Sequence, residues 1–375
     1  MMEKYLPNKP WCLHPFHSMS LNLEGHYRLC CEAMQFKETF NEVSPQEFFS
    51  TKEIINIKET MMHGDPLAHK GIQHYCQRCI KSEKASGTSR RKRINKDKGF
   101  TKQFSLQISG FGNKCNLMCN HCSSYLSSKW AHFAKKLKSN NDEYKHLIDV
   151  ERYADTTALE YPATQDHMFN EFLNFVNSKV DSIDLSGGEV LINKKMKDFI
   201  NKVDTNKRIT INTNGSIDTR IYERFYEVNP NIRYNVSFDG LRDVHTLIRT
   251  LSDWDMYENN LKFFADKQIK VMLFLSLQSL NVLQLKEILE YTNRWSFDFD
   301  WHFVHTPAHL CISNLHPNVK EQAFDMLETI DSEKIDLNPI YKLLKVPYVK
   351  KEWETLLDWL KLHEKHHNQT LHFKT

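Results

Sequence analysis

Three cysteines in the middle of the chain have the spacing of ligands to a metal centre. Cys115, Cys119 and Cys122 stand in the stretch KCNLMCNHC, separated by three residues and then by two. Thiolates favour zinc, copper(I) or iron–sulfur clusters. A structural zinc site normally takes a fourth Cys or His, but His121 adjoins Cys122, and adjacent side chains rarely reach one ion. In a [4Fe–4S] cluster, three thiolates would leave one iron open to a substrate or cofactor.

Five further cysteines in the first eighty residues predict a second site. They are Cys12, Cys30, Cys31, Cys76 and Cys79. Four thiolates are enough to close a metal site of the zinc-ribbon kind. Cys30 and Cys31 would point to opposite faces of a hairpin, so we expect only one of them to be a ligand. The ninth cysteine, Cys311, stands alone near the C-terminal end.

The composition of the 375 residues is that of a globular protein, with 26% charged and 40% hydrophobic residues. A formal net charge of +3 gives no general argument for nucleic-acid binding. No apolar run approaches the roughly 20 residues of a membrane helix, and residues 1–11 lack the apolar core of a signal peptide. We therefore expect a cytoplasmic protein with no membrane partner and no specific nucleic-acid partner. The basic run Arg90–Arg93 is interpreted as a solvated linker, with a site for an anionic partner as the alternative.

Strand patterns alternate with helical patterns from residue 100 onward. The strand patterns cover 104–109, 182–186, 208–215, 232–240, 270–278 and 299–307. Alternation of this kind indicates parallel strands joined by right-handed crossovers. Six strands suit a partial α/β barrel or an open doubly wound sheet, and in both folds function lies at the C-terminal ends of the strands.

The chain is predicted to have three segments. Residues 1–99 form a small Cys-rich module with a hairpin around Glu24-Gly25 and a helix from Pro45 to Gly64. Residues 100–315 form the α/β core. Residues 316–375 form a helical extension on the outside of the sheet, and its histidine-rich end, EKHHNQTLHF, is expected to be solvated.

Two motifs in the core resemble those of one family, the radical S-adenosylmethionine (SAM) enzymes. Cys115, Cys119 and Cys122 follow the first strand with the spacing of the family's cluster-binding signature. The stretch SGGEVLI after the second strand is similar to the family's Gly-Gly-Glu-Pro motif, with Val190 in place of the proline. This resemblance implies a partial (β/α)6 TIM-type barrel.

The resemblance also assigns roles to residues at the strand ends. It implies that the three cysteines hold a [4Fe–4S] cluster whose open iron binds SAM. Gly187, Gly188 and Glu189 would contact the SAM amino group, Asn214 would face SAM, and Arg249 would bind the carboxylate. Ser237 and Asp239 would lie near the ribose and Val304 near the adenine. For each of these strand-end residues, a purely structural role is the alternative.

The N-terminal cysteines resemble those of twitch or SPASM-type modules, which hold an auxiliary [4Fe–4S] cluster. SPASM modules usually follow the barrel, whereas here the module precedes it. The resemblance favours a second cluster on Cys12, Cys76, Cys79 and one of Cys30 and Cys31 over a zinc site.

The implied reaction is reductive cleavage of SAM to a 5′-deoxyadenosyl radical that abstracts hydrogen from a substrate. A peptide or protein is the favoured substrate, with a sugar or small molecule as the alternative, and a flavodoxin or ferredoxin is the expected electron donor. His302, His305 and Cys311 are candidates for substrate chemistry, against a packing role for each. The competing interpretations are a zinc-stabilised binding protein without catalysis and a degenerate relative that binds SAM without turnover.

Overall fold

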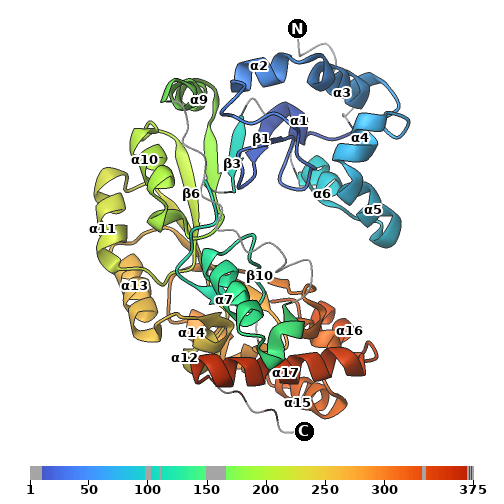
Figure 1. Cartoon of the computed structure of the whole chain (residues 1–375), viewed down its shortest axis with the longest axis vertical. Helices are drawn as coiled ribbons and strands as arrows, with labels where there is room; N and C mark the ends of the chain where they lie inside the picture. Colours follow the sequence, from blue (N-terminus) through green and yellow to red (C-terminus); the bar gives the residue numbers. More distant parts are fainter. Residues whose placement is uncertain are drawn as a thin grey trace. The chain divides into compact units, whose positions relative to one another are not determined.

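The computed structural model describes residues 11–97, 103–109, 111–148, 166–331 and 335–369, together with 371 and 373. The chain forms two compact units, the first of residues 1–112 and 159–210 and the second of residues 113–158 and 211–375. Figure 1 follows the course of the chain and labels its elements. These units do not coincide with the predicted segments, whose boundaries at 99 and 315 stay predictions. No helix within the described ranges is long and apolar enough to span a membrane.

The first unit is built on a sheet to which the N-terminal segment contributes. Its strands are β1 (Ser18–Leu21), β2 (Tyr27–Arg28), β3 (Ser105–Ile108), β5 (Ser182–Leu185) and the start of β6 (Arg208–Thr213). β1 is antiparallel to β2, which confirms the predicted hairpin, and Gly25 in its turn has φ 83°. β1 also pairs in parallel with β3, which in turn pairs in parallel with β5. The predicted Cys-rich module therefore shares a sheet with the first core strand.

Two neighbouring helices of the first unit, α2 (Pro45–Ser50) and α3 (Lys52–His63), begin at capping residues. Ser44 and Glu47 form a reciprocal capping box at the start of α2, and the Oγ1 of Thr51 accepts from the backbone of Ile54 at the start of α3. The single helix predicted up to Gly64 is therefore two helices, and Gly64 ends the second as expected. The helices are α1 (His14–His17), α2 (Pro45–Ser50), α3 (Lys52–His63), α4 (Lys70–Tyr75), α5 (Gln77–Ser86), α6 (Arg90–Asp97), α9 (Asp166–Lys179) and α10 (Lys194–Lys202), with the 3-10 helix η3 (Val190–Ile192).

The second unit contains the later strands of the sheet and a separate two-stranded pair. The end of β6 is followed by β7 (Arg233–Ser237), β9 (Val271–Leu277) and β10 (Asp298–Phe303), in the order β10-β9-β7-β6. β7 and β10 both pair in parallel with β9. The two-stranded pair is antiparallel and joins β4 (Met118–Cys119) to β8 (Arg249–Thr250).

The helices of the second unit cover one face of its strands. Tyr222 of α11 and Phe264 of α13 pack against Tyr234 of β7, with ring centroids 5.6 and 5.2 Å from that of Tyr234. The helices are α7 (Ser128–Ser139), α11 (Thr219–Val228), α12 (Arg242–Ile248), α13 (Trp254–Asp266), α14 (Leu285–Thr292), α15 (Pro317–Glu328), α16 (Asn338–Leu344) and α17 (Lys350–His367). Four 3-10 helices join them: η2 (Glu143–Leu147), η4 (Val282–Gln284), η5 (Ala308–Leu310) and η6 (Ile312–Asn314).

The fold class predicted from the sequence is confirmed. The strands β3, β5, β6, β7, β9 and β10 follow one another along the chain with helices between them, as in a partial TIM-type barrel, and helices end the chain. In such a fold, helices cover one face of each strand. Buried and less buried residues therefore alternate along β6 and β7.

The histidine-rich end, EKHHNQTLHF, is partly solvated: Glu364, Lys365 and Asn368 are exposed, whereas His366 is half-buried and its Nε2 lies 3.1 Å from the Asp142 carboxylate. His363, which precedes this stretch, is fully buried. Trp359 of α17 packs against Trp130 of α7, with ring centroids 5.5 Å apart. Because α7 directly follows the cysteine triplet, α17 supports the loop that carries these thiols.

Candidate functional site

The cysteine triplet occupies a loop that is held by its own side chains. Ser127 Oγ donates to the Leu117 carbonyl (2.7 Å), and Asn113 Nδ2 donates to the Ser124 carbonyl (3.0 Å). Trp130 Nε1 donates to the Cys119 carbonyl at 2.8 Å. These bonds satisfy backbone carbonyl groups of a segment that follows β3 and contains only the two-residue strand β4 among its described residues before α7. They fix the backbone that carries Cys115, Cys119 and Cys122.

A pair of asparagines ties this loop to the end of β6. Asn214 Nδ2 donates to Asn116 Oδ1 at 2.7 Å, and Asn116 Nδ2 donates to the Ser216 carbonyl at 2.6 Å. Asn214 Oδ1 accepts from the Ser216 backbone at 2.8 Å. Asn214, which the resemblance placed near SAM, therefore also positions the residue that follows the first cysteine.

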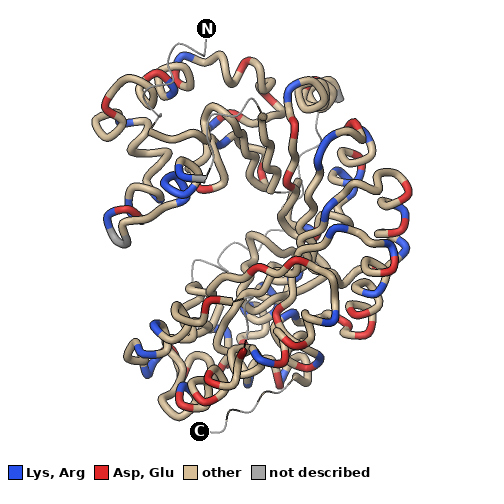
Figure 2. Tube along the Cα trace, turned by 180° about the vertical axis from the view of Figure 1, so that it is seen from behind, with Lys and Arg blue, Asp and Glu red and all other residues tan. Residues whose placement is uncertain are grey.

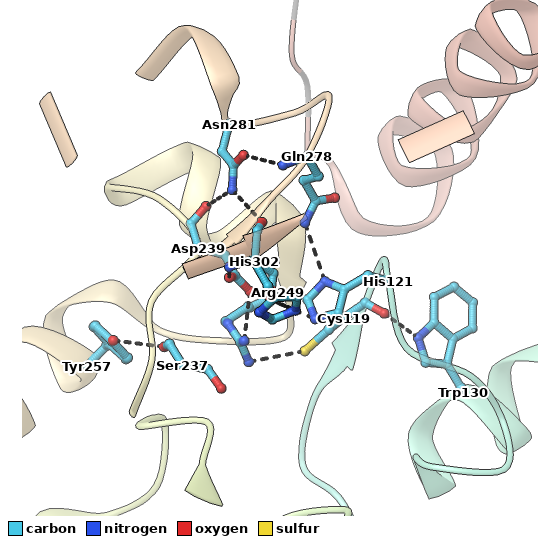
Figure 3. A network of polar contacts seen from close by, with 11 residues as sticks. Cys119, His121, Trp130, Ser237, Asp239, Arg249, Tyr257, Gln278, Asn281 and His302 are labelled. Carbon is cyan, nitrogen blue, oxygen red and sulfur yellow. Dashed lines mark hydrogen bonds and ion pairs between the residues drawn. The ribbon is translucent and has the colours of Figure 1, made fainter. Parts of the chain in front are cut away.

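A buried ion pair lies directly beside the second cysteine (Figure 3). The β4–β8 pairing sets Cys119 opposite Arg249. Arg249 Nη1 lies 3.6 Å from Cys119 Sγ, and Arg249 Nη2 lies 2.7 Å from Asp239 Oδ2. Arg249 is 4% exposed and Asp239 is not exposed at all. Three residues that the sequence nominated separately therefore form one cluster.

The positive charge of Arg249 favours the ionised forms of both Cys119 and Asp239. Burial raises the pKa of the Cys119 thiol, whereas the Arg249 guanidinium acts to lower it. Burial also opposes the charged form of Asp239, but Arg249 and then His121 hold the pKa of this carboxyl below its usual value. A buried carboxylate next to a guanidinium stays ionised because the pair offsets the loss of hydration.

Gln278 and Asn281 complete the surroundings of Asp239, and the sequence did not nominate either. Asn281 Nδ2 donates to the Asp239 carbonyl at 2.9 Å, and the Ser276 backbone donates to Asp239 Oδ1 at 2.8 Å. His121 lies between the Gln278 amide, 3.4 Å from its Nδ1, and Asp239, 3.9 Å from its Nε2. The sequence could have nominated them by their position, because Gln278 ends the predicted strand 270–278 and Asn281 follows it closely.

The remaining candidates of the second unit lie at strand ends. The Ser237 carbonyl accepts from Tyr257 Oη at 2.9 Å. Val304 is buried, and its backbone donates to the Leu277 carbonyl at 2.9 Å.

His302 and His305 have separate neighbours. His302 Nε2 lies 3.4 Å from Ser276 Oγ, so His302 shares the neighbourhood of Asp239. His305 Nδ1 instead lies 3.9 Å from Cys311 Sγ.

The Gly-Gly-Glu motif belongs to the first unit. Gly187 has φ 90°, and a Cβ there would collide with the Ser109 carbonyl, so only glycine fits. Gly188 also has a positive φ of 53°. Glu189 is fully buried, and its Oε1 accepts from the Leu191 backbone at 3.2 Å.

Four of the five N-terminal cysteines influence one another electrostatically. Burial, with smaller contributions from the Cys30 and Cys79 thiols, raises the pKa of Cys12 to about 12. Burial likewise raises the pKa of Cys76, to which Cys12, Cys30 and Cys79 all contribute. These residues come from three separate stretches of the first unit.

Cys31 has different surroundings. After burial, the strongest influences on its pKa are Arg90, which lowers it, and Glu32, which raises it. Cys31 nevertheless raises the pKa of the adjacent Cys30, where it is the largest influence after burial. The two adjacent cysteines thus differ in the influences on their pKa, although they also affect each other.

Both sets of thiols have the donor chemistry of iron–sulfur ligands. All nine cysteines are thiols, without a disulfide. Within the described ranges, no three His, Cys, Asp or Glu side chains are already arranged around a single metal ion. A cluster of four irons holds its sulfur ligands farther apart than one ion does, and thiolates are the usual ligands of such clusters. Thiolates of both groups are donors that suit an iron–sulfur cluster, and zinc uses the same donors.

A comparison with protein families identifies the class of this chain. Residues 109–291 match the model described as the radical SAM superfamily. The match covers just under half of the chain and spans the cysteine triplet, Gly187–Glu189, Asp239 and Arg249, so residues 109–291 have the sequence of a radical SAM domain. No curated protein sequence matches the chain significantly.

Solved structures similar to this chain include three radical SAM proteins. The first, anSMEcpe with bound AdoMet and the Kp18Cys peptide, is 14% identical over 71% of this chain and 62% of its own, with a TM-score of 0.39. SuiB from Streptococcus suis, bound to the precursor peptide SuiA, is 14% identical over 73% of this chain and 49% of its own (TM-score 0.38). TYW1 with a lysine-pyruvate adduct is 14% identical over 68% of this chain and 84% of its own (TM-score 0.34). The chain thus spans less than two thirds of anSMEcpe and about half of SuiB.

Proposed function

We propose that this protein is a radical SAM enzyme that holds a [4Fe–4S] cluster on Cys115, Cys119 and Cys122. The observation that carries the proposal is the buried Arg249–Asp239 pair at Cys119, within the residues that match the family model. When bound, the cluster supplies the electron that cleaves SAM to the 5′-deoxyadenosyl radical, which abstracts hydrogen from the substrate. The protein supplies the ligands, the orientation of SAM and the exclusion of water.

Arg249 has two tasks in this proposal. Its positive charge favours the thiolate of Cys119, the form that binds iron. Its Nε is buried and has no hydrogen-bond partner in the described part of the chain. An unsatisfied buried donor is costly, and the carboxylate of SAM would satisfy it. Asp239 holds the guanidinium in place from the opposite side.

Other polar residues are proposed to orient SAM as the family resemblance implies. Asp239 and Ser237 would serve the ribose, Asn214 would face SAM, and Val304 would border the adenine. In the first unit, Gly187, Gly188 and Glu189 would serve the amino group.

Cys12, Cys30, Cys76 and Cys79 are proposed to hold a second [4Fe–4S] cluster. Their mutual electrostatic influence supports this set, and the different surroundings of Cys31 leave it out. Four thiolates leave no iron open for a substrate, so this cluster would conduct electrons. Zinc is the alternative occupant.

The substrate is proposed to be a peptide or protein, because family members with auxiliary clusters often modify such substrates. A sugar or small molecule is the alternative. A flavodoxin or ferredoxin would donate the electrons, and a cytoplasmic location stays a prediction. His302, near Ser276 in the second unit, and Cys311 with His305 remain the candidates for substrate chemistry.

Anaerobic reconstitution tests the proposal. The protein with iron and sulfide should be brown, and after reduction with dithionite it should convert SAM to 5′-deoxyadenosine, measured by mass spectrometry. Cys311→Ala is the matched control, because it removes a buried thiol outside both groups and should leave the iron content unchanged. A colourless zinc protein would contradict the proposal, as would an iron protein that binds SAM without cleaving it.

A further inference from the structure

A cavity in the first unit lies beside the N-terminal cysteines and is lined by arginines. It has a volume of about 330 Å³ and opens between α5, α6 and the turn that joins them. Arg78, Arg90 and Arg93 line it together with Cys79. In Figure 2, basic residues gather along α5 and α6. The basic run Arg90–Arg93, which was interpreted as a linker, therefore belongs to helix α6, and this helix forms one side of the cavity.

Helical geometry divides the four basic residues Arg90–Arg93 into two faces. Arg91 stacks on the Trp11 ring, 4.3 Å from its centroid, and its guanidinium pairs with Glu83. Lys92 Nζ donates to the Gly87 carbonyl at 2.8 Å. Arg90 and Arg93, three residues apart, share a helix face, and both line the cavity. Two of the four cations thus have structural partners, and the other two face an open volume.

The charges of the cavity walls are unbalanced. Three guanidinium groups face one carboxylate, that of Glu32, which lies 3.9 Å from Arg78 with both side chains about half exposed. Arg90 Nε is buried and has no hydrogen-bond partner among the described residues. Like charges that share a cavity repel one another unless an anion joins them. Guanidinium groups bind carboxylate and phosphate groups through paired hydrogen bonds.

We propose that this cavity binds the phosphate or carboxylate group of a small organic anion through Arg78, Arg90 and Arg93. The cavity holds a ligand of small-molecule size, and its charge excess selects an anion. Cys79 lines the same cavity. If Cys79 is a cluster ligand, which rests on the proposed function, the bound anion lies next to the second cluster.

Isothermal titration of the whole chain with inorganic phosphate, and separately with succinate, tests the proposal. The experiment uses reduced protein at low and constant ionic strength. We expect saturable binding of at least one anion. Binding of phosphate alone assigns a phosphoryl ligand, binding of succinate alone assigns a carboxylate ligand, and either result supports the site. The loss of one charge-assisted pair should weaken binding about tenfold.

Two substitutions locate the binding. Arg93→Gln and Arg78→Gln change half-exposed or exposed side chains, so the fold should survive, as circular dichroism would verify. Each should weaken binding about tenfold. The exposed Arg224→Gln in the second unit is the matched control and should bind like the wild type. Absence of saturable binding, or equal affinity in the wild type and Arg93→Gln, would overturn the proposal.

Electron paramagnetic resonance of the reconstituted protein separates this inference from the proposed second cluster. An anion beside Cys79 should shift the spectrum of a second cluster in the wild type and leave that of Arg93→Gln unchanged. Anion binding by a protein with one cluster would refute the second cluster and leave the anion site intact. Two clusters without anion binding would refute the anion site alone.

Discussion

The two groups of cysteines differ in how the chain brings them together and in what surrounds them. Cys115, Cys119 and Cys122 come from one loop, and a buried ion pair lies beside Cys119. The N-terminal thiols come from the segment before α1, the residues after β2 and the start of α5. After burial, the pKa values of Cys12 and Cys76 are raised by other thiols of the group and lowered by Arg91.

This difference indicates two kinds of site. Three thiols beside a fixed guanidinium leave room for a ligand that carries its own negative charge. Four thiols, if they hold one metal centre as proposed, would complete its coordination shell without a further ligand. The first arrangement suits a site where a small molecule binds metal, and the second suits a site that carries electrons or stabilises structure.

Cys119→Ala should have the largest effect. It removes the central ligand of the triplet, so 5′-deoxyadenosine production should fall below detection and about half of the iron should be lost. Mass spectrometry and iron analysis of the same reconstituted sample measure both. Undiminished SAM cleavage would show that the triplet is not the reactive site.

Cys76→Ala should affect only the other group. It too should lose about half of the iron, yet SAM cleavage with dithionite should persist because the triplet keeps its cluster. Iron analysis beside the activity assay distinguishes the two groups. An unchanged iron content would refute the second cluster.

The adjacent pair Cys30 and Cys31 provides a matched comparison within the second group. Cys30→Ala should reduce the iron content as Cys76→Ala does, whereas Cys31→Ala should leave it unchanged. The physical reason is that Arg90 and Glu32 are the main charged influences on the pKa of Cys31, whereas Cys30 also acts on Cys12 and Cys76. If Cys31→Ala loses iron and Cys30→Ala does not, Cys31 is the ligand and Cys30 is not.

Arg249→Lys tests the feature that the second group lacks. Lysine keeps the positive charge beside Asp239 but loses the forked geometry, so SAM cleavage should fall about 10- to 100-fold. The exposed Arg233→Lys is the control and should retain full activity. Steady-state rates measure the change. Full activity of Arg249→Lys would mean that the guanidinium only neutralises Asp239.

A smaller effect concerns the helix that supports the triplet. Burial lowers the pKa of His363 to about 3, so the folded state keeps this imidazole neutral while the unfolded chain takes up a proton below about pH 6.5. Its contribution to stability is present above pH 6.5 and lost as the pH falls toward 3. Below pH 6.5 the free energy of unfolding should drop by up to about 1.4 kcal/mol per pH unit from this residue.

Urea unfolding of the apoprotein at pH 7.5 and pH 5.5 measures that slope. His363→Gln should flatten it, whereas a substitution at an exposed position, His132→Gln, should keep the wild-type slope. Identical slopes in all three proteins would show that His363 does not titrate with folding.

The sequence by itself determined the alternation of strands and helices, the fold class and the resemblance to radical SAM enzymes. It did so because these features depend on local spacing: the Cys115–Cys122 pattern, the glycines at 187 and 188, and the alternation of strand and helix. Hydrophobic periodicity and turn residues act over a few positions, so they can be recognised without the fold.

Only the tertiary structure decided which side chains meet. Cys119 and Arg249 are 130 residues apart in the chain, and the β4–β8 pairing that joins them has no local signature. The same holds for the different charged groups that act on Cys30 and Cys31, for the cavity at Arg90 and Arg93, and for the burial of His363. These contacts depend on packing between distant segments, and the identity of one residue does not reveal which distant partner the folded chain will bring to it.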